Sequence, residues 1–120
     1  MTYRKSVGDL GEKIAADFLV RQDYFIETKN YHSRFGEIDI VASKSDCLYF
    51  IEVKTRSNQE FGLAEESINF FKKDKLFKTI QDYLSKNEIE SEYCFQVIII
   101  YLDFQARRAK IKHYPQVALF

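Results

Sequence analysis

The sequence predicts an α/β domain whose mixed sheet is flanked by helices, and three observations lead to this class. Two segments, residues 7–22 and residues from 67 or 69 to 85, carry apolar side chains at helical spacing. Five shorter segments are rich in β-branched and aromatic residues and are predicted strands: 24–31, 36–43, 47–55, 93–102 and 108–114. The link between the third and fourth strands contains the second helix and is long enough for a parallel crossover.

The first helix is expected to begin after Ser6, because a serine side chain can accept a hydrogen bond from a free amide of the first turn. Apolar residues then recur at three- and four-residue spacing and form one stripe: Val7, Leu10, Ile14 and Phe18. The second helix has a similar apolar face and is expected to stop at Asn87. Both helices are therefore expected to pack on the sheet.

The second and third strands are expected to form a hairpin. Lys44, Ser45 and Asp46 separate them, and small polar side chains suit a tight reversal because they hydrogen-bond to their own backbone. The continuous apolar run in residues 97–102 is typical of an interior strand that is buried on both faces. Residues 108–114 alternate lysines with less polar residues, which predicts an exposed final strand near the sheet edge.

The composition indicates a single domain over residues 1–120, since 46% hydrophobic and 16% aromatic residues supply one core. Cys47 and Cys94 lie in apolar runs, where reduced thiols behave as small hydrophobic groups. We find no apolar signal core and no segment near the ~20 apolar residues of a membrane span, so we expect a cytoplasmic protein without a membrane partner. The formal net charge is zero, and nucleic-acid binding would have to use local basic faces.

Charged residues interrupt the second and third strands, where a core strand should be apolar. Because side chains alternate along a strand, Glu52 and Lys54 are expected to share one face. Asp39 is likewise expected to lie on the face opposite Ile38 and Ile40. A two-residue turn between these strands would place Asp39 directly across from Glu52, with Cβ atoms ~5 Å apart.

Two carboxylates at that separation repel each other, so the arrangement requires a cation or a shared proton. Mg²⁺, or Mn²⁺, would meet this need with Asp39, Glu52 and a backbone carbonyl, such as that of Val53, as ligands. Lys54 would reach the same space, where its ammonium could orient an attacking water or neutralise charge on a phosphate. The alternative is a surface ion-pair network on a solvated sheet face.

Glu12 is a fourth candidate. It lies at the margin of the apolar stripe of the first helix, among the small residues Gly8, Gly11, Ala15 and Ala16. Such a carboxylate could reach a metal at the sheet surface directly or through a water. The alternative is an ordinary exposed glutamate.

Five basic residues are candidates for contacts with a phosphate backbone: Arg4, Lys5, Arg34, Arg56 and Lys72. Each could equally be an ordinary surface charge. The two histidines, His32 and His113, have no partner at metal-ligand spacing, so neither is expected to bind a metal.

Several spaced motifs resemble a known family. They are Gly8-Asp-Leu-Gly-Glu-Lys-Ile-Ala, Asn30, Gly36-Glu-Ile-Asp-Ile-Val, Ile51-Glu-Val-Lys-Thr-Arg, Phe61-Gly62, Lys72 with Leu76, Tyr83-Leu84 and Ala118-Leu-Phe. In this order they span most of the chain. The sequence resembles the bacterial YraN-like proteins, which look like members of the PD-(D/E)XK nuclease superfamily.

The resemblance implies a restriction-endonuclease-like fold with an αβββαβ core, to which the final strand adds an edge. It also implies similarity to archaeal Holliday junction resolvases, whose site combines a helix glutamate with a D...ExK motif. Carried over to this chain, Glu12, Asp39 and Glu52 would be metal ligands and Lys54 the catalytic lysine.

The chain differs from these relatives at two positions. They often have arginine where it has His32, which makes a phosphate contact there less expected. They often have aspartate where it has Gln96, so that position is not expected to be essential for metal binding.

The leading functional hypothesis is a metal-dependent DNA endonuclease, structure-selective or weakly selective, that acts in repair or recombination. A second hypothesis is a nucleic-acid-binding or adaptor module that keeps the nuclease fold without efficient cleavage, and a third is a scaffold that binds another protein. A homodimer would suit a branched substrate with two symmetry-related strands. The set Glu12, Asp39, Glu52 and Lys54 favours the enzyme, because a binding module gains nothing from clustered carboxylates near phosphate.

Overall fold

The computed structural model describes residues 3–57 and 70–119, which form two helices and five strands. Their bounds are α1 (Tyr3–Arg21), β1 (Phe25–Ser33), β2 (Gly36–Lys44), β3 (Cys47–Ser57), α2 (Phe70–Lys86), β4 (Tyr93–Asp103) and β5 (Arg108–Tyr114). The predicted α/β class is confirmed, as is the αβββαβ order with an added final strand.

The strands form one mixed sheet in the order β1-β2-β3-β4-β5. β3 and β4 are parallel, whereas the other three neighbouring pairs are antiparallel. Parallel neighbours need a crossover connection, and α2 is part of it. β4 is buried along most of its length and β5 forms an edge of the sheet, so both predictions for these strands are confirmed.

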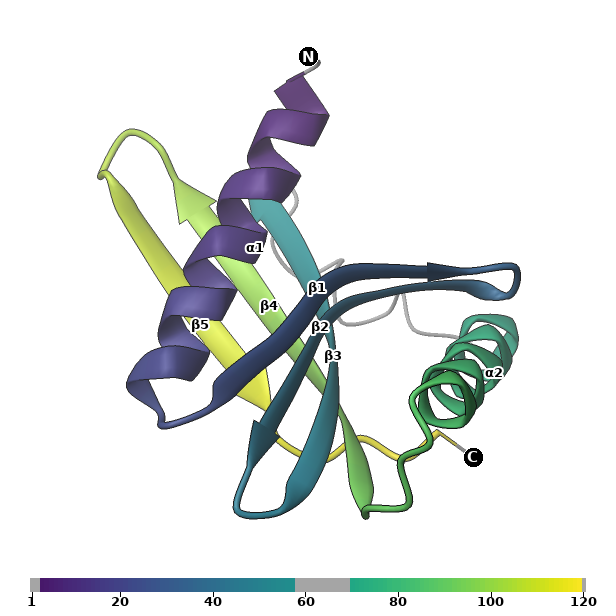
Figure 1. The fold of residues 1–120 in the computed structure, drawn as a ribbon. Coiled ribbons are helices and arrows are strands. Elements are labelled where there is room, and N and C mark those ends of the chain that lie inside the picture. The colour runs from purple at the N-terminus through teal and green to yellow at the C-terminus, as the bar shows by residue number, and fades with distance from the viewer. Residues whose placement is uncertain (1–2, 58–69, 120) are drawn as a thin grey trace.

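The two helices cover opposite faces of the sheet (Figure 1). α1 packs Ala15, Ala16 and Leu19 against β2, β3 and β4, and we call this layer the α1 core. α2 packs Leu76 and Ile80 against the other face, and we call this layer the α2 core. Alternate residues of β4 enter the two layers, which is why that segment is continuously apolar. Within the described ranges, neither helix is long and apolar enough to cross a membrane.

One helix start differs from its prediction. α1 begins at Tyr3, so Ser6 lies inside the helix, and the prediction that it is the N-cap was wrong. The three residues before Ser6 are compatible with helical backbone, and none of them is a glycine or proline that would stop the helix. The start expected for the second helix, at residue 67 or 69, lies outside the described residues. Its end is confirmed, because α2 stops before Asn87, whose side-chain amide donates to the Tyr83 carbonyl at 2.9 Å.

The β2–β3 hairpin has the predicted two-residue turn. Ser45 and Asp46 have positive φ angles of 51° and 64°, as in the type I′ turns whose twist matches that of the flanking strands. This turn sets the register of the hairpin, and the paired positions run as far as Ile40 opposite Ile51.

The pairing of β2 with β3 stops one residue before Asp39 would meet Glu52. At this point the amide of Val53 donates instead to the side chain of Asp39, with 2.7 Å between N and Oδ2. The strands then diverge, since β2 bends with β1 toward α2 while β3 continues beside β4 (Figure 1). The bend overturns one prediction: Ile38 packs in the α2 core and Ile40 in the α1 core, so the two do not share a face.

α1 approaches β3 closely at Gly11. A Cβ atom at this glycine would lie 1.8 Å from Oγ1 of Thr55 and 2.7 Å from its Cγ2. The helix and strand could not pack at this distance with a larger residue, because three atoms of the half-buried Thr55 side chain would lie within 3 Å of the added Cβ. Glu12 follows Gly11 directly, so this contact also positions Glu12 over the sheet.

We predict that Gly11→Ala destabilises the protein by about 2 kcal/mol, although alanine has the higher helix propensity, because the added methyl group overpacks the contact with Thr55. Gly8→Ala is the matched control. A Cβ at Gly8 would meet nothing within 4 Å, so this variant should be stabilised by up to about 1 kcal/mol. Chemical denaturation of both variants measures the effect, and equal stability of the two would contradict the close contact.

Candidate active site

A cavity of about 380 Å³ lies in the fork between β2 and β3, on the face that α2 covers. We call it the fork cavity. Its strand side is lined by Gly36, Glu37, Asp39, Glu52 and Val53, and its helix side by Lys72, Lys75, Leu76 and Thr79. Carboxylates and ammonium groups dominate this lining, so the cavity suits a small charged ligand better than an apolar one.

Asp39 lies in the cavity with one carboxylate oxygen held by the Val53 amide at 2.7 Å. Burial raises the pKa of Asp39 to about 6, although the Val53 hydrogen bond acts in the opposite direction. The negative charges of Glu12, Glu52 and Glu37 raise this pKa further. Asp39 therefore lies in a negative and poorly solvated environment in which a cation would stabilise its ionised form.

Glu52 contacts two lysines through the same oxygen. Its Oε1 is 2.6 Å from the Nζ of Lys72 and 3.5 Å from the Nζ of Lys54. Burial lowers the pKa of Lys54, and the nearby Lys72 lowers this pKa further. The other oxygen of Glu52, Oε2, is buried and has no hydrogen-bond partner in the described part of the chain. The prediction that Glu52 and Lys54 share a face is thereby confirmed.

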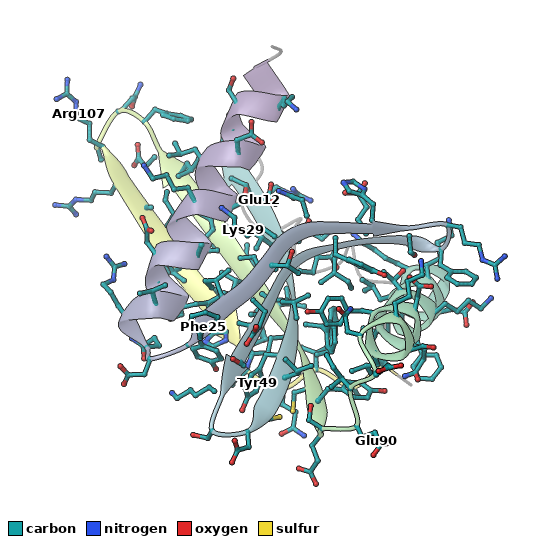
Figure 2. All side chains as sticks on the ribbon, viewed as in Figure 1. Glu12, Phe25, Lys29, Tyr49, Glu90 and Arg107 are labelled. Atoms are coloured by element: carbon teal, nitrogen blue, oxygen red, sulfur yellow. The ribbon has the colours of Figure 1, made fainter. Side chains whose placement is uncertain are left out.

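Glu12 lies near the cavity but not in its lining. It projects from α1 beside Lys29 of β1 (Figure 2). Its charge raises the pKa of Asp39, and burial raises the pKa of Glu12 itself, with a smaller contribution from Asp9. The Oε1 atom of Glu12 is also buried without a hydrogen-bond partner among the described residues. The structure thus brings Glu12 within electrostatic reach of Asp39.

The donor set fits a divalent cation that retains water. Within residues 3–57 and 70–119, no three histidine, cysteine, aspartate or glutamate side chains form a group that could hold a metal. The cavity instead offers three carboxylates, of which Glu37 is exposed and Asp39 and Glu52 are half-buried. Oε2 of Glu52 is a buried anionic oxygen without a hydrogen-bond partner among the described residues. Mg²⁺ is commonly held by one or two carboxylates together with several waters, so these residues match its requirements better than those of Ca²⁺ or Zn²⁺.

The predicted phosphate-binding residues occupy different parts of the fold. Lys72 lines the fork cavity. Arg34 is exposed at the turn between β1 and β2, and Arg56 is half-buried near the end of β3. Lys5 is exposed on α1, and the side chain of Arg4 lies outside the described part of the structure.

Sequence reasoning missed several residues of the cavity. Glu37 lies two residues before Asp39, so strand alternation could have placed both side chains on one face. A single glutamate in a strand is not by itself a signal of a functional site. Lys75 and Thr79 come from α2, whose orientation over the hairpin could not be read from its apolar face alone. The ion pair of Lys72 with Glu52 was missed for the same reason, because it joins a helix to a strand twenty residues earlier.

Gln96 belongs to the other side of the sheet. It is buried, its amide nitrogen is 3.1 Å from the hydroxyl of Tyr24, and its carbonyl oxygen is 2.9 Å from Nε2 of His113. Since Gln96 has the same alternation as Ile98, which packs in the α1 core, it points away from the fork cavity. Burial lowers the pKa of His113, so this ring is a neutral partner in a buried hydrogen-bond network.

The fold and the cavity together define a class. A mixed five-stranded sheet with a helix on each face, and carboxylates at a fork between two antiparallel strands, is compatible with a restriction-endonuclease-like core. The chain belongs to the uncharacterised protein family UPF0102, whose family model matches residues 11–100. The resemblance to YraN-like proteins drawn from the sequence motifs is thereby confirmed.

Relatives in the same family cover most of the chain. A UPF0102 protein of Clostridium botulinum (strain 657 / Type Ba4) is 41% identical over 96 residues, which is 80% of this chain and 78% of the relative. One from Caldanaerobacter subterraneus subsp. tengcongensis is 41% identical over 101 residues, 83% of each chain. One from Caldicellulosiruptor bescii is 39% identical over 110 residues, 89% of this chain and 92% of the relative.

We predict that Asp39→Asn stabilises the metal-free protein above pH 7 and not below about pH 4. Ionised Asp39 is disfavoured in the fold, because its folded pKa of about 6 lies above the ordinary aspartate pKa of 3.8. The wild type therefore loses stability relative to the variant as pH rises through this interval, by about 2 kcal/mol after allowance for partial solvent screening. Denaturation in the presence of a chelator, from pH 4 to pH 8, measures the difference. A variant less stable than the wild type at pH 8 would contradict the assigned environment.

Proposed function

We propose that this protein is a divalent-metal-dependent endonuclease that hydrolyses phosphodiester bonds in DNA, with Mg²⁺ or Mn²⁺ as its cofactor. The observation that carries the proposal is the presence of Asp39 and Glu52 in one cavity, where Lys54 contacts Glu52 and one buried oxygen of Glu52 has no hydrogen-bond partner among the described residues. A polar cavity of this composition is better explained by charge-dependent chemistry on a phosphate than by packing.

In this proposal the carboxylates of Asp39 and Glu52 and the carbonyl of Val53 hold the metal, and Glu12 binds it directly or through a water. The metal would supply Lewis acidity at the scissile phosphate and lower the pKa of a bound water. The Val53 amide holds Asp39 in place, so the ligand is oriented before the metal arrives.

Lys54 is the proposed catalytic lysine. Burial lowers its pKa, so its ammonium can release or share a proton more readily than an exposed lysine can. From its position beside Glu52 it would orient the attacking water and neutralise charge that develops on the phosphate. The Lys54 side chain could thus both orient the attacking water and neutralise the charge on the phosphate.

Arg34, Arg56, Arg4 and Lys5 are the proposed contacts to the phosphate backbone. They lie on three different segments of the chain, since Arg4 and Lys5 are neighbours in α1, so they would hold an extended or branched nucleic acid rather than a single mononucleotide. Structure-selective cleavage in repair or recombination, with a homodimer acting on two related strands, would agree with this distribution.

A second function is favoured by one observation. Glu52 is already neutralised by Lys54 and Lys72, and the described residues contain no preassembled group of three ligands for a metal. A module that binds nucleic acid without cleaving it would need no metal and could keep this ion-pair network. Cleavage assays separate the two functions.

We predict that the purified protein cleaves branched, single-stranded or duplex DNA in Mg²⁺ or Mn²⁺, and that Glu52→Ala and Lys54→Ala each lower the rate by about 10²-fold or more. Circular dichroism of each variant confirms that the fold is retained. Arg21→Ala, on the far end of α1, serves as a charge-removing control that should cleave normally. Cleavage that survives both site substitutions would indicate a contaminant, and binding without cleavage on all substrates would favour the second function.

A further inference from the structure

Among the described residues, Lys72 is the closest ion-pair partner of Glu52, and it comes from a different layer of the fold. It lies near the start of α2, whereas Glu52 and Lys54 lie two residues apart on β3. Its ammonium is 2.6 Å from Oε1 of Glu52, compared with 3.5 Å for Lys54. The side chain of Lys72 is 33% exposed, whereas those of Glu52 and Lys54 are 12% and 13% exposed. Lys72 therefore has access to solvent at the edge of the cavity, while Lys54 is enclosed.

We propose that Lys72 is a built-in cation that competes with the divalent metal for Glu52 and must move off this carboxylate before the metal binds. This inference rests on the proposed function, since it concerns how the same site acquires its cofactor. It assigns to Lys72 a regulatory role at the ligand, beyond the general phosphate contact expected for a basic residue.

The competition follows from the geometry of the carboxylate. Coordination of a metal by Glu52 requires its oxygens to face the cavity, and one of them already accepts a short contact from Lys72. A divalent ion would lie close to this ammonium whether it bound the same oxygen or Oε2 of the same carboxylate, so the two cations would repel each other strongly. Glu52 and Lys54 lie two residues apart on β3 and their side chains are little exposed, so Lys72, with its partly exposed four-carbon stem, is the group that can withdraw.

Two consequences follow for the protein without metal. Lys72 compensates the charge of Glu52, whose second oxygen is buried without a hydrogen-bond partner among the described residues, so the pair stabilises the cavity when no metal is bound. The same ion pair weakens metal binding, because the Lys72–Glu52 contact has to be broken before Glu52 can bind the metal. Lys72 also faces the cavity edge after withdrawal, where its charge would meet an incoming phosphate. Binding of the metal would then raise the affinity for phosphate, and binding of phosphate would raise the affinity for the metal.

Lys75 provides a matched control. It lines the same cavity from one turn further along α2 and carries the same charge, but it is exposed and makes no ion pair with Glu52 in the described structure. Substitution of either lysine removes one positive charge near the site. Substitution of Lys72 alone removes the competitor for the ligand.

The test is isothermal titration calorimetry of metal-free protein with MnCl₂, for the wild type, Lys72→Gln, Lys72→Arg and Lys75→Gln. We expect Lys72→Gln to bind Mn²⁺ with a dissociation constant at least about fivefold lower than that of the wild type, and Lys75→Gln to change it by less than about twofold. Lys72→Arg keeps a cation at the same place and should bind Mn²⁺ no more tightly than the wild type. Thermal unfolding of the same samples should show that Mn²⁺ raises the Tm of Lys72→Gln more than that of the wild type.

Equal or weaker Mn²⁺ affinity of Lys72→Gln, or an equal gain in Lys75→Gln, would overturn the competition while the metal site itself stands. If Lys72→Gln does not fold, Lys72→Arg decides, because tighter binding by that variant would overturn the proposal. Absence of Mn²⁺ binding in the wild type and in all variants would overturn both this inference and the proposed function.

Discussion

The hydrogen bond from the Val53 amide to the Asp39 carboxylate decides where β2 and β3 separate. It takes the place of a main-chain bond at the position where the antiparallel ladder ends, so the two strands diverge from that point. The fork cavity exists because of this divergence, and Asp39 and Glu52 both line it because the two-residue turn sets the register. A turn of a different length would move Asp39 to another register position, so Asp39 and Glu52 would no longer line the same cavity.

The fork cavity contains charged side chains that the packing of the fold does not require. Burial and three neighbouring carboxylates raise the pKa of Asp39, and Glu52 requires lysines from a strand and a helix to balance it. Polar groups of this kind lower stability unless they are compensated, so their presence in a buried position is a reason to infer function. The family relationship supports a shared fold and leaves the chemistry to be established at the site.

Much of the fold could be predicted from sequence because it depends on local patterns. Periodicity identified both helices and all five strands, and the residues at 45 and 46 were sufficient to predict the hairpin register. The patterns failed where tertiary contacts decide. The bend at Asp39 separates Ile38 from Ile40, and the docking of α2 brings Lys72 to Glu52. Neither leaves a signal in a single sequence, since each depends on how elements pack rather than on residues close in the chain.

A crystal structure of the protein grown with MnCl₂, with anomalous scattering recorded for manganese, would show directly whether the fork cavity binds a metal. We expect an anomalous peak in the fork cavity, with oxygens of both Asp39 and Glu52 within about 2.3 Å of it and Lys72 moved away from Glu52. A fully occupied manganese site elsewhere on the molecule, with the Lys72–Glu52 ion pair intact and the fork cavity free of metal, would contradict it.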